Sequence, residues 1–168
     1  MIFVGGLSGS GKTSMIRNLV SRIPEYTHIQ ASAILRSIDR PIEGLTLDEA
    51  IENQAALADW IAKLSNVDRK RAILDGHGIL IVDDAPLQVP FEFFNAIGLS
   101  RIVLITGEPS LILKNRTWPA SLSSPEAIAL LQEIEAATLR DVSKKLGVDM
   151  HGVNSGDLDR LYQVFELK

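Results

Sequence analysis

The sequence predicts an α/β fold: a three-layer, doubly wound protein in which helices cover both faces of a parallel five-stranded sheet. Short apolar runs alternate along the chain with segments of helical periodicity, which is the pattern of βαβ units. The apolar runs are continuous, as is typical of strands buried on both faces. The 168 residues show no internal repeat and no linker. We therefore expect residues 1–168 to form a single domain.

Five short segments are the predicted strands of the sheet, and the last of them is weakly patterned because it contains Asp149 and His151. The five segments occupy residues 2–5, 26–30, 72–75, 102–105 and 148–153. A further apolar run, residues 79–82, leads into Asp83 and Asp84. After this run, Pro86 and Pro90 predict a loop, because proline punctuates regular structure.

The helices are predicted from apolar residues three and four positions apart and from their capping residues. Thr46 and Glu49 form a capping-box sequence at the start of a long helix that ends near residue 64. Its buried face is expected to comprise Leu47, Ile51, Leu57, Ile61 and Leu64. Pro125 and Gly147 delimit a second long helix. Shorter helices are expected at residues 12–22, around 34–38, and at 91–97, 109–116 and 157–165.

Residues 6–13 read Gly-Leu-Ser-Gly-Ser-Gly-Lys-Thr, which matches the phosphate-binding motif G-x-x-x-x-G-K-[ST]. The motif lies between the first predicted strand and the first predicted helix, as this motif requires. Its glycines let backbone N–H groups turn onto phosphate oxygens, and the helix N-terminus adds partial positive charge. The motif therefore predicts binding of a nucleoside triphosphate by Gly6, Ser8, Gly9, Ser10, Gly11, Lys12, Thr13 and Ser14.

The same motif predicts a catalytic cation and a metal ligand. Lys12, with its ammonium group exposed, is expected to reach the β- and γ-phosphates, and the Thr13 hydroxyl is expected to bind Mg²⁺. Two carboxylates are candidates for the second group that anchors the ion, a role that such a carboxylate usually fills through a bound water. Asp83 follows the better apolar run, whereas Asp75 ends the run at 72–75 and fits better by its order along the chain.

Composition excludes several classes of function. The net charge of −4 gives no overall attraction to nucleic acid or to an anionic membrane. The absence of cysteine excludes disulfides, thiolate metal sites and a cysteine nucleophile. No apolar run approaches the roughly 20 residues that span a bilayer. With no basic, apolar leader at its start, the chain is expected to be cytoplasmic.

Several segments together resemble the nucleoside monophosphate kinases, and archaeal-type adenylate kinases most of all. They are residues 27–36, which end in Leu-Arg, the stretch Leu-Asp-Gly-His at 74–77, residues 103–116, and the helix at 127–140. The resemblance implies a nucleotide kinase-like P-loop NTPase fold, and transfer of the γ-phosphoryl group from ATP·Mg²⁺ to a nucleoside monophosphate. It also implies acceptor-side helices at about 31–64 and a short lid at about 115–124.

The resemblance further assigns roles to individual residues. It implies that Arg36 holds the acceptor's phosphate and that Arg116, with Lys114 as a possible helper, stabilises the transferring phosphoryl group. It places Asn154 in the loop that lines the adenine. Arg36 is equally compatible with a surface position at a helix end. His77, between two glycines at a strand end, is either an acceptor-binding or a structural residue.

The sequence also departs from the family, and the departures leave two functions open. No Pro-Arg pair follows Asp75-Gly76-His77, and residues 117–124 contain no basic residue. The leading interpretation is a kinase whose partners are ATP and a small phosphate or hydroxyl acceptor. The alternative is an ATP-dependent switch or assembly factor that hydrolyses ATP slowly, which a lid poor in basic residues suits. A kinase of nucleic-acid ends is disfavoured by the negative charge. His28, His151, Trp60 and Trp118 are interpreted as structural.

Overall fold

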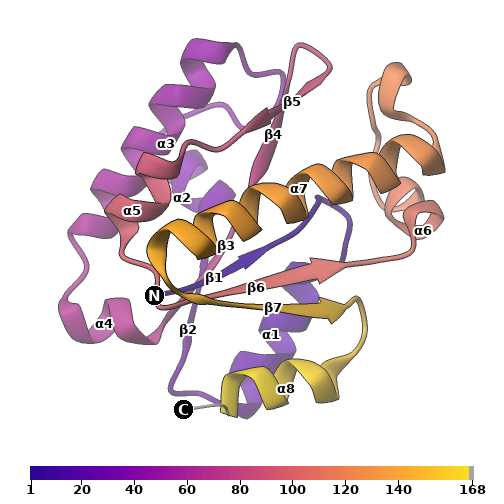
Figure 1. Ribbon diagram of the computed structural model, residues 1–168. Coiled ribbons are helices and arrows are strands. Elements are labelled where there is room, and N and C mark those ends of the chain that lie inside the picture. Colours follow the sequence, from indigo (N-terminus) through magenta and orange to yellow (C-terminus); the bar gives the residue numbers. More distant parts are fainter. Residues whose placement is uncertain (167–168) are drawn as a thin grey trace.

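A parallel five-stranded sheet forms the middle layer, with the strand order β2-β3-β1-β6-β7 (Figure 1). The computed structural model describes residues 1–166. The strand that precedes the phosphate-binding motif, β1 (Ile2–Gly5), is the central one and pairs with β3 (Ala72–Asp75) and β6 (Arg101–Thr106). The predicted fold class and the five predicted strands are confirmed.

The helices follow the predicted positions closely. In chain order the remaining elements are α1 (Lys12–Arg22), β2 (Thr27–Gln30), α2 (Ala31–Ser37), α3 (Leu47–Ala62), α4 (Asn66–Arg71), β4 (Ile79–Val82), β5 (Ala85–Gln88), α5 (Phe91–Ile97), α6 (Pro109–Lys114), the 3₁₀ helix η1 (Ala120–Leu122), α7 (Pro125–Leu146), β7 (Asp149–Asn154) and α8 (Leu158–Glu166). Within residues 1–166, no helix combines the length and the hydrophobicity needed to cross a bilayer.

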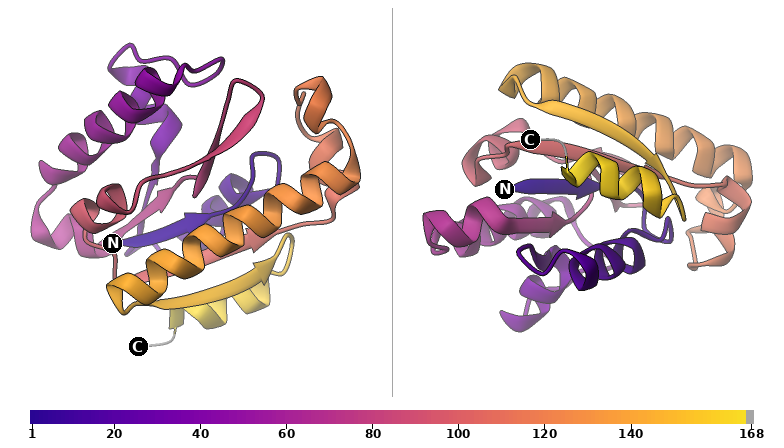
Figure 2. Two further views of the ribbon diagram at one scale, coloured as in Figure 1. Left: turned by 45° about the horizontal axis from the view of Figure 1, so that its top comes forward. Right: turned by 90° about the horizontal axis from the view of Figure 1, so that it is seen from below.

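Successive strand residues point to opposite faces of the sheet, and each face has its own hydrophobic core. On one face, Phe3 and Leu74 pack with residues of α2, α3, α5 and α7. On the other face, Val4, Ile73 and Val103 pack with α1 and α8. Figure 2 shows the three layers from below, with α7 on one side of the sheet and α1 and α8 on the other. Both faces of the three inner strands β3, β1 and β6 are therefore buried, which is why these strands are rich in apolar residues, whereas the edge strands β2 and β7 are partly exposed.

The apolar run at 79–82 belongs to a separate two-stranded hairpin. Strands β4 and β5 are antiparallel and are joined by Asp83 and Asp84, which have positive φ angles of 48° and 58°. Two such residues make the tight turn typical of hairpins. The predicted loop at Pro86 is wrong, because Pro86 lies within β5. Proline is tolerated there because both strands of a two-stranded hairpin are edge strands.

Two further predictions need correction. Helix α4 has no long apolar pattern and was not expected; Ser65 caps it by accepting a hydrogen bond from the backbone N–H of Asp68. In α3, Leu47 and Ile51 are half exposed, although they were expected in the core. The buried stripe of α3 instead runs through Ala50, Asn53, Leu57 and Ile61. These residues are three and four positions apart, so they share one face of the helix.

The predicted capping box of α3 is present. The Thr46 hydroxyl accepts a hydrogen bond from the Glu49 N–H, and the Glu49 carboxylate accepts one from the Thr46 N–H at 2.8 Å. This backbone hydrogen bond lowers the pKa of Glu49. The cap fixes the start of α3, the helix that forms one wall of the cavity described below.

We expect Thr46→Ala to lower the free energy of unfolding by about 1 kcal/mol, the usual cost of losing an N-cap side chain. Thr46→Ser, which keeps the hydroxyl, should leave it nearly unchanged. Urea denaturation followed by circular dichroism measures both values. Equal destabilisation by the two variants would contradict a capping role.

Candidate active site

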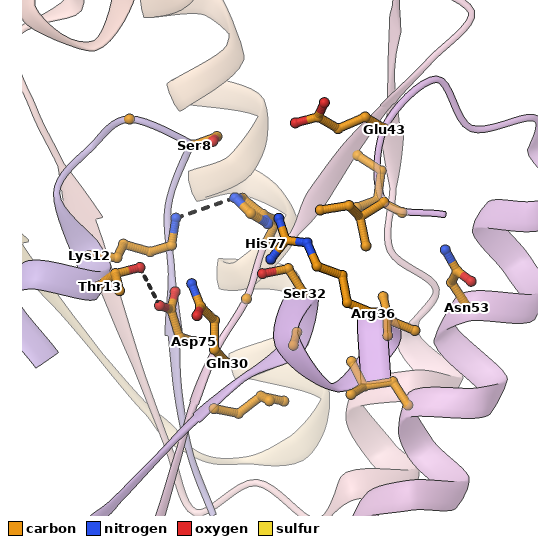
Figure 3. A pocket seen from close by; sticks show the side chains of 18 of the residues that line it. Ser8, Lys12, Thr13, Gln30, Ser32, Arg36, Glu43, Asn53, Asp75 and His77 are labelled. Atoms are coloured by element: carbon orange, nitrogen blue, oxygen red, sulfur yellow. Dashed lines mark hydrogen bonds between the residues drawn. The ribbon is translucent and has the colours of Figure 1, made fainter. Parts of the chain in front are cut away.

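A cavity of about 480 Å³ opens beyond the carboxyl ends of β1 and β3 (Figure 3). Its walls come from the phosphate-binding loop, from α2 and α3, and from residues 115 and 116 after α6. Ligands of open α/β sheets bind at this end of the strands. Lys12, Thr13 and Asp75 lie on the loop side, and the opposite side, formed by α2 and α3, carries both aliphatic side chains and polar ones such as Arg36 and Asn53.

The phosphate-binding loop depends on its glycines. Gly6, Gly9 and Gly11 have φ angles of 140°, 85° and 86°, which residues with a side chain rarely adopt. A Cβ atom at Gly6 would also lie 2.3 Å from the carbonyl oxygen of Ile105. The loop residues that line the cavity are Ser8, Gly9, Gly11, Lys12, Thr13 and Ser14.

Three of the predicted nucleotide-binding residues lie outside this cavity. Gly6 donates its N–H to the carboxylate of Glu135 at 2.8 Å, so this N–H does not point to a phosphate. Ser10 is buried, and its N–H is bonded to the carbonyl oxygen of Leu7. Asn154 is exposed at the end of β7, where its side chain accepts a hydrogen bond from Thr106. Of the eight predicted residues between positions 6 and 14, two therefore shape the loop and six line the cavity.

The Lys12 ammonium group is buried rather than exposed, which corrects the sequence-based expectation. Its Nζ atom donates to the carbonyl oxygens of Gly6, at 2.6 Å, and Leu7, at 3.0 Å, and lies 3.4 Å from Nε2 of His77. Burial lowers the pKa of Lys12, and the nearby carboxylates of Asp75 and Glu135 oppose this effect. The loop carbonyls thus hold the cation at the floor of the cavity.

Thr13 and Asp75 lie in direct contact. The Thr13 hydroxyl donates to Oδ2 of Asp75 at 2.7 Å, and Nε2 of His28 lies 3.2 Å from the same oxygen. Burial raises the pKa of Asp75, but the bonds from His28 and Thr13 and the charge of Lys12 outweigh it and lower the pKa overall. Asp75 is therefore ionised at neutral pH. His28, interpreted from the sequence as purely structural, holds this carboxylate in place.

This pair of oxygens fits a magnesium ion. Mg²⁺ prefers oxygen ligands and retains several waters, so a hydroxyl and one carboxylate beside bound phosphates suffice. Residues 1–166 contain no group of three or more His, Asp and Glu side chains arranged to hold a metal ion. Asp83 lies exposed in the turn between β4 and β5 and lines a neighbouring cavity, so of the two candidate carboxylates only Asp75 contacts Thr13.

His77 lies between Lys12 of the loop and Arg36 of α2 (Figure 3). Burial, together with the positive charges of Lys12 and Arg116, lowers its pKa to about 3, although Asp75 opposes the shift. The ring is therefore neutral at physiological pH. Because an ammonium group only donates, Nε2 of His77 accepts from Lys12, and the ring proton is assigned to Nδ1.

Two arginines reach the cavity from opposite sides. Arg36 extends into it from α2 (Figure 3). Arg116 follows α6 and lines both this cavity and a second one of about 640 Å³ next to it, under the β4–β5 hairpin. Its guanidinium group lies 5.3 Å from the centre of the Trp118 ring. Lys114 is exposed and does not line either cavity.

The predicted lid at 115–124 is attached to the body of the protein. Trp118 is 7% exposed and packs with Leu7, Ile79 and Ile112. At the start of the segment, the Asn115 amide donates to the carbonyl oxygen of Gly9 at 2.9 Å. The indole and the amide anchor the segment and place Arg116 beside the phosphate-binding loop.

Sequence reasoning missed Glu135, which is completely buried in α7. It accepts hydrogen bonds from the N–H groups of Gly6, Gly78 and Ile79. Burial raises its pKa, against the opposing effect of these bonds and of Lys12. A signal was present in the sequence: Glu135 stands four residues after Leu131 and four before Leu139, on the apolar stripe of the helix.

The family model of the AAA domain matches residues 5–120, which is more than half of the chain and includes the phosphate-binding loop. The chain belongs to the AAA domain family. No curated protein is significantly similar to it in sequence.

Solved structures show the same fold. The shikimate kinase from Acinetobacter baumannii in complex with shikimate superimposes with a TM-score of 0.62 at 18% identity, covering 99% of this chain and 94% of that one. The shikimate kinase from Bacteroides thetaiotaomicron gives a TM-score of 0.56 at 16% identity, covering 99% and 98%. This AAA domain therefore has the α/β fold of a P-loop kinase.

We expect Asp75→Asn to weaken the binding of Mg²⁺ together with ATP by at least about 10-fold, because the amide loses the charge that attracts the ion. Asp83→Asn should leave binding unchanged, since Asp83 lies in the hairpin turn. Isothermal titration calorimetry with and without Mg²⁺ measures both affinities. If Asp83→Asn lowers the affinity more than Asp75→Asn does, the carboxylate that binds the ion is Asp83 in the hairpin turn.

The low pKa of His77 gives a pH prediction. Its ring signals should stay constant between about pH 5 and pH 8, since the group titrates near 3 in the folded protein. The unfolded chain binds a proton near 6.5, so folding stability contributed by the neutral ring is present above 6.5 and is lost as the pH falls toward 3. Two-dimensional ¹H–¹³C NMR, with His77→Asn to assign the signal, checks this. A midpoint near 6.5 would contradict it.

Proposed function

We propose that this protein is an adenylate kinase-like enzyme that transfers the γ-phosphoryl group of ATP to a nucleoside monophosphate. The observation that carries the proposal is one continuous cavity with Lys12 and Thr13 on one side and Arg36 on the other. The first two residues suit a nucleotide triphosphate with its metal ion. A guanidinium group facing them suits a second phosphate, which it binds in a bidentate manner.

The surroundings of the cavity favour a phosphate acceptor over a hydroxyl acceptor. A hydroxyl must lose its proton to a base as it attacks, whereas a phosphate oxygen is already ionised at neutral pH. The two carboxylates that line the cavity are Glu43 and Asp75. Asp75 is bonded to Thr13 and His28, and Glu43 is exposed at the rim. His77, with a pKa of about 3, is a weak base.

In this mechanism the protein positions the reactants and neutralises charge. The loop N–H groups and Lys12 hold the donor phosphates, and Arg36 orients the acceptor phosphate so that its oxygen attacks the γ-phosphorus. The bond from phosphorus to the bridging oxygen of ADP breaks as the new bond forms. Arg116 neutralises charge on the equatorial oxygens. Thr13 and Asp75 would hold Mg²⁺, which would supply further neutralisation of phosphate charge.

A second candidate function is a slowly hydrolysing ATP-dependent switch. One observation favours it: within residues 115–124, Arg116 is the sole basic residue, so few cations face the transferring phosphoryl group. Weak stabilisation of this group fits the slow ATP hydrolysis of a switch better than it fits fast phosphoryl transfer.

Measuring ADP formation with nucleoside monophosphates, with shikimate and with no acceptor separates the two functions. A kinase should show phosphoryl transfer to one monophosphate well above basal hydrolysis, with little response to shikimate. Lys12→Ala should abolish transfer while circular dichroism shows an intact fold. Stimulation by shikimate instead would overturn the choice of acceptor.

We expect Arg116→Ala to lower phosphoryl transfer by on the order of 10²-fold or more, the scale of losing a group that stabilises transferring charge. Lys114→Ala is the matched control, because this neighbouring cation lies outside the cavity, and it should retain the wild-type rate. If no acceptor stimulates ADP release and Arg116→Ala leaves basal hydrolysis unchanged, the switch replaces the kinase.

A further inference from the structure

The carboxylate of Glu135 collects hydrogen bonds from two segments that lie far apart in the sequence. Its Oε1 atom accepts from the N–H of Gly6 at 2.8 Å and from the N–H of Gly78 at 2.7 Å, and Oε2 accepts from the N–H of Ile79 at 2.8 Å. Gly6 begins the phosphate-binding loop, and Gly78 follows His77 on the acceptor side. One oxygen atom thus fixes the separation of the two segments.

The same residues form a closed circuit of contacts around Lys12. Gly6 donates its N–H to Glu135 and accepts the Lys12 ammonium group on its carbonyl oxygen. Lys12 contacts His77, and the next residue, Gly78, returns to Glu135. The circuit thus joins the phosphate-binding loop to the His77 segment twice, through the carboxylate of Glu135 and through the contact of Lys12 with His77. A displacement of the carboxylate therefore changes the position of both Lys12 and His77.

The packing around Glu135 is tight and specific. A Cβ atom at Gly5 would lie 2.5 Å from Leu139 and 3.3 Å from Oε1 of Glu135, and one at Gly78 would lie 3.0 Å from Leu139. Helix α7 approaches both segments this closely because these positions are glycines. A buried carboxylate costs free energy unless its hydrogen bonds are satisfied. Here three backbone N–H groups donate to the carboxylate. An apolar side chain at this position would fill the space but would accept none of these hydrogen bonds.

We propose that Glu135 is a positioning residue that couples the phosphate-binding loop to the His77 segment, so that binding of nucleotide orders the acceptor side of the cavity. Glu135 touches neither reactant in this arrangement and acts through Gly6 and Gly78. Its effect on catalysis rests on the proposed kinase function. Its effect on the coupling of the two segments is independent of that function, because binding of an ATP analogue alone reveals the coupling.

The test compares Glu135→Gln with Glu133→Gln, an exposed glutamate on the same helix. A carboxamide has one acceptor oxygen, and its NH₂ group would face a backbone N–H that needs an acceptor. Hydrogen exchange is measured on each protein with and without Mg²⁺ and a non-hydrolysable ATP analogue. In wild type and Glu133→Gln, the analogue should slow exchange in residues 5–8 and 76–79 together. In Glu135→Gln, the slowing at 76–79 should disappear.

Kinetics provide the second readout. At temperatures well below its melting temperature, Glu135→Gln should lose about 10²-fold in kcat, as expected when reacting groups are misplaced by about 1 Å, while Glu133→Gln keeps the wild-type value. If Glu135→Gln does not fold, Glu135→Asp, which keeps the charge on a shorter side chain, is measured in the same way.

The outcomes are distinguishable. A lower melting temperature with wild-type exchange behaviour at 76–79 would mean that Glu135 is structural only, and would overturn the proposal. If the wild-type protein shows no phosphoryl transfer, the kinase function fails. The exchange result then still decides the role of Glu135.

Discussion

The buried ammonium group of Lys12 is the constraint on which the rest of the site depends. A cation removed from water is stable only where polar groups replace its hydration. Two loop carbonyls supply this replacement, and they point inward because the loop glycines adopt positive φ angles. The carboxylates of Asp75 and Glu135 add compensating charge from β3 and α7. The loop conformation and the two buried acids are thus parts of one electrostatic arrangement.

The parallel sheet explains why these groups meet. Strands β1 and β3 are adjacent and run in the same direction, so the loop after each begins at the same edge. Thr13, at the start of α1, and Asp75, at the end of β3, are 62 positions apart and yet share a hydrogen bond. The strand ends set the position of the chemistry, and the surrounding helices determine which molecules reach it.

Most of the sheet and the donor side of the site were predictable from the sequence. The inner strands are rich in apolar residues, and the fixed positions of the phosphate-binding motif have chemical requirements that their residue types reveal. Asp83 was a competing metal candidate because residues 79–82 are as apolar as a core strand. They are apolar because β4 packs on both sides: Val82 lies in a cluster with Leu45 and Ala50, and Ile79 lies in a cluster with residues of α6 and α7. A run of four apolar residues does not distinguish a strand of the central sheet from a strand of a packed hairpin.

Other features were not predictable, because they depend on contacts between distant segments. The place of Glu135 on the apolar stripe of α7 can be read from the sequence, but its three N–H partners cannot, because they lie in segments that α7 meets only in the folded protein. The anchoring of residues 115–124 likewise follows from Trp118 entering a cluster formed by three other elements. The expected face of α3 is confirmed at Leu57 and Ile61 and wrong at Leu47 and Ile51, because Ala50 and Asn53 occupy the buried stripe in the first half of the helix.

The β4–β5 hairpin has a consequence for how this molecule can diversify. It contributes no strand to the five-stranded sheet, and it rejoins the body through a bond from the N–H of Val89 to the carbonyl oxygen of Gly78. Leu80 of the hairpin nevertheless lines both cavities. A change in the length or sequence of the hairpin tip would leave the parallel sheet and the phosphate-binding loop intact. The lining of both cavities on this side can therefore change, by evolution or by engineering, while the fold is kept.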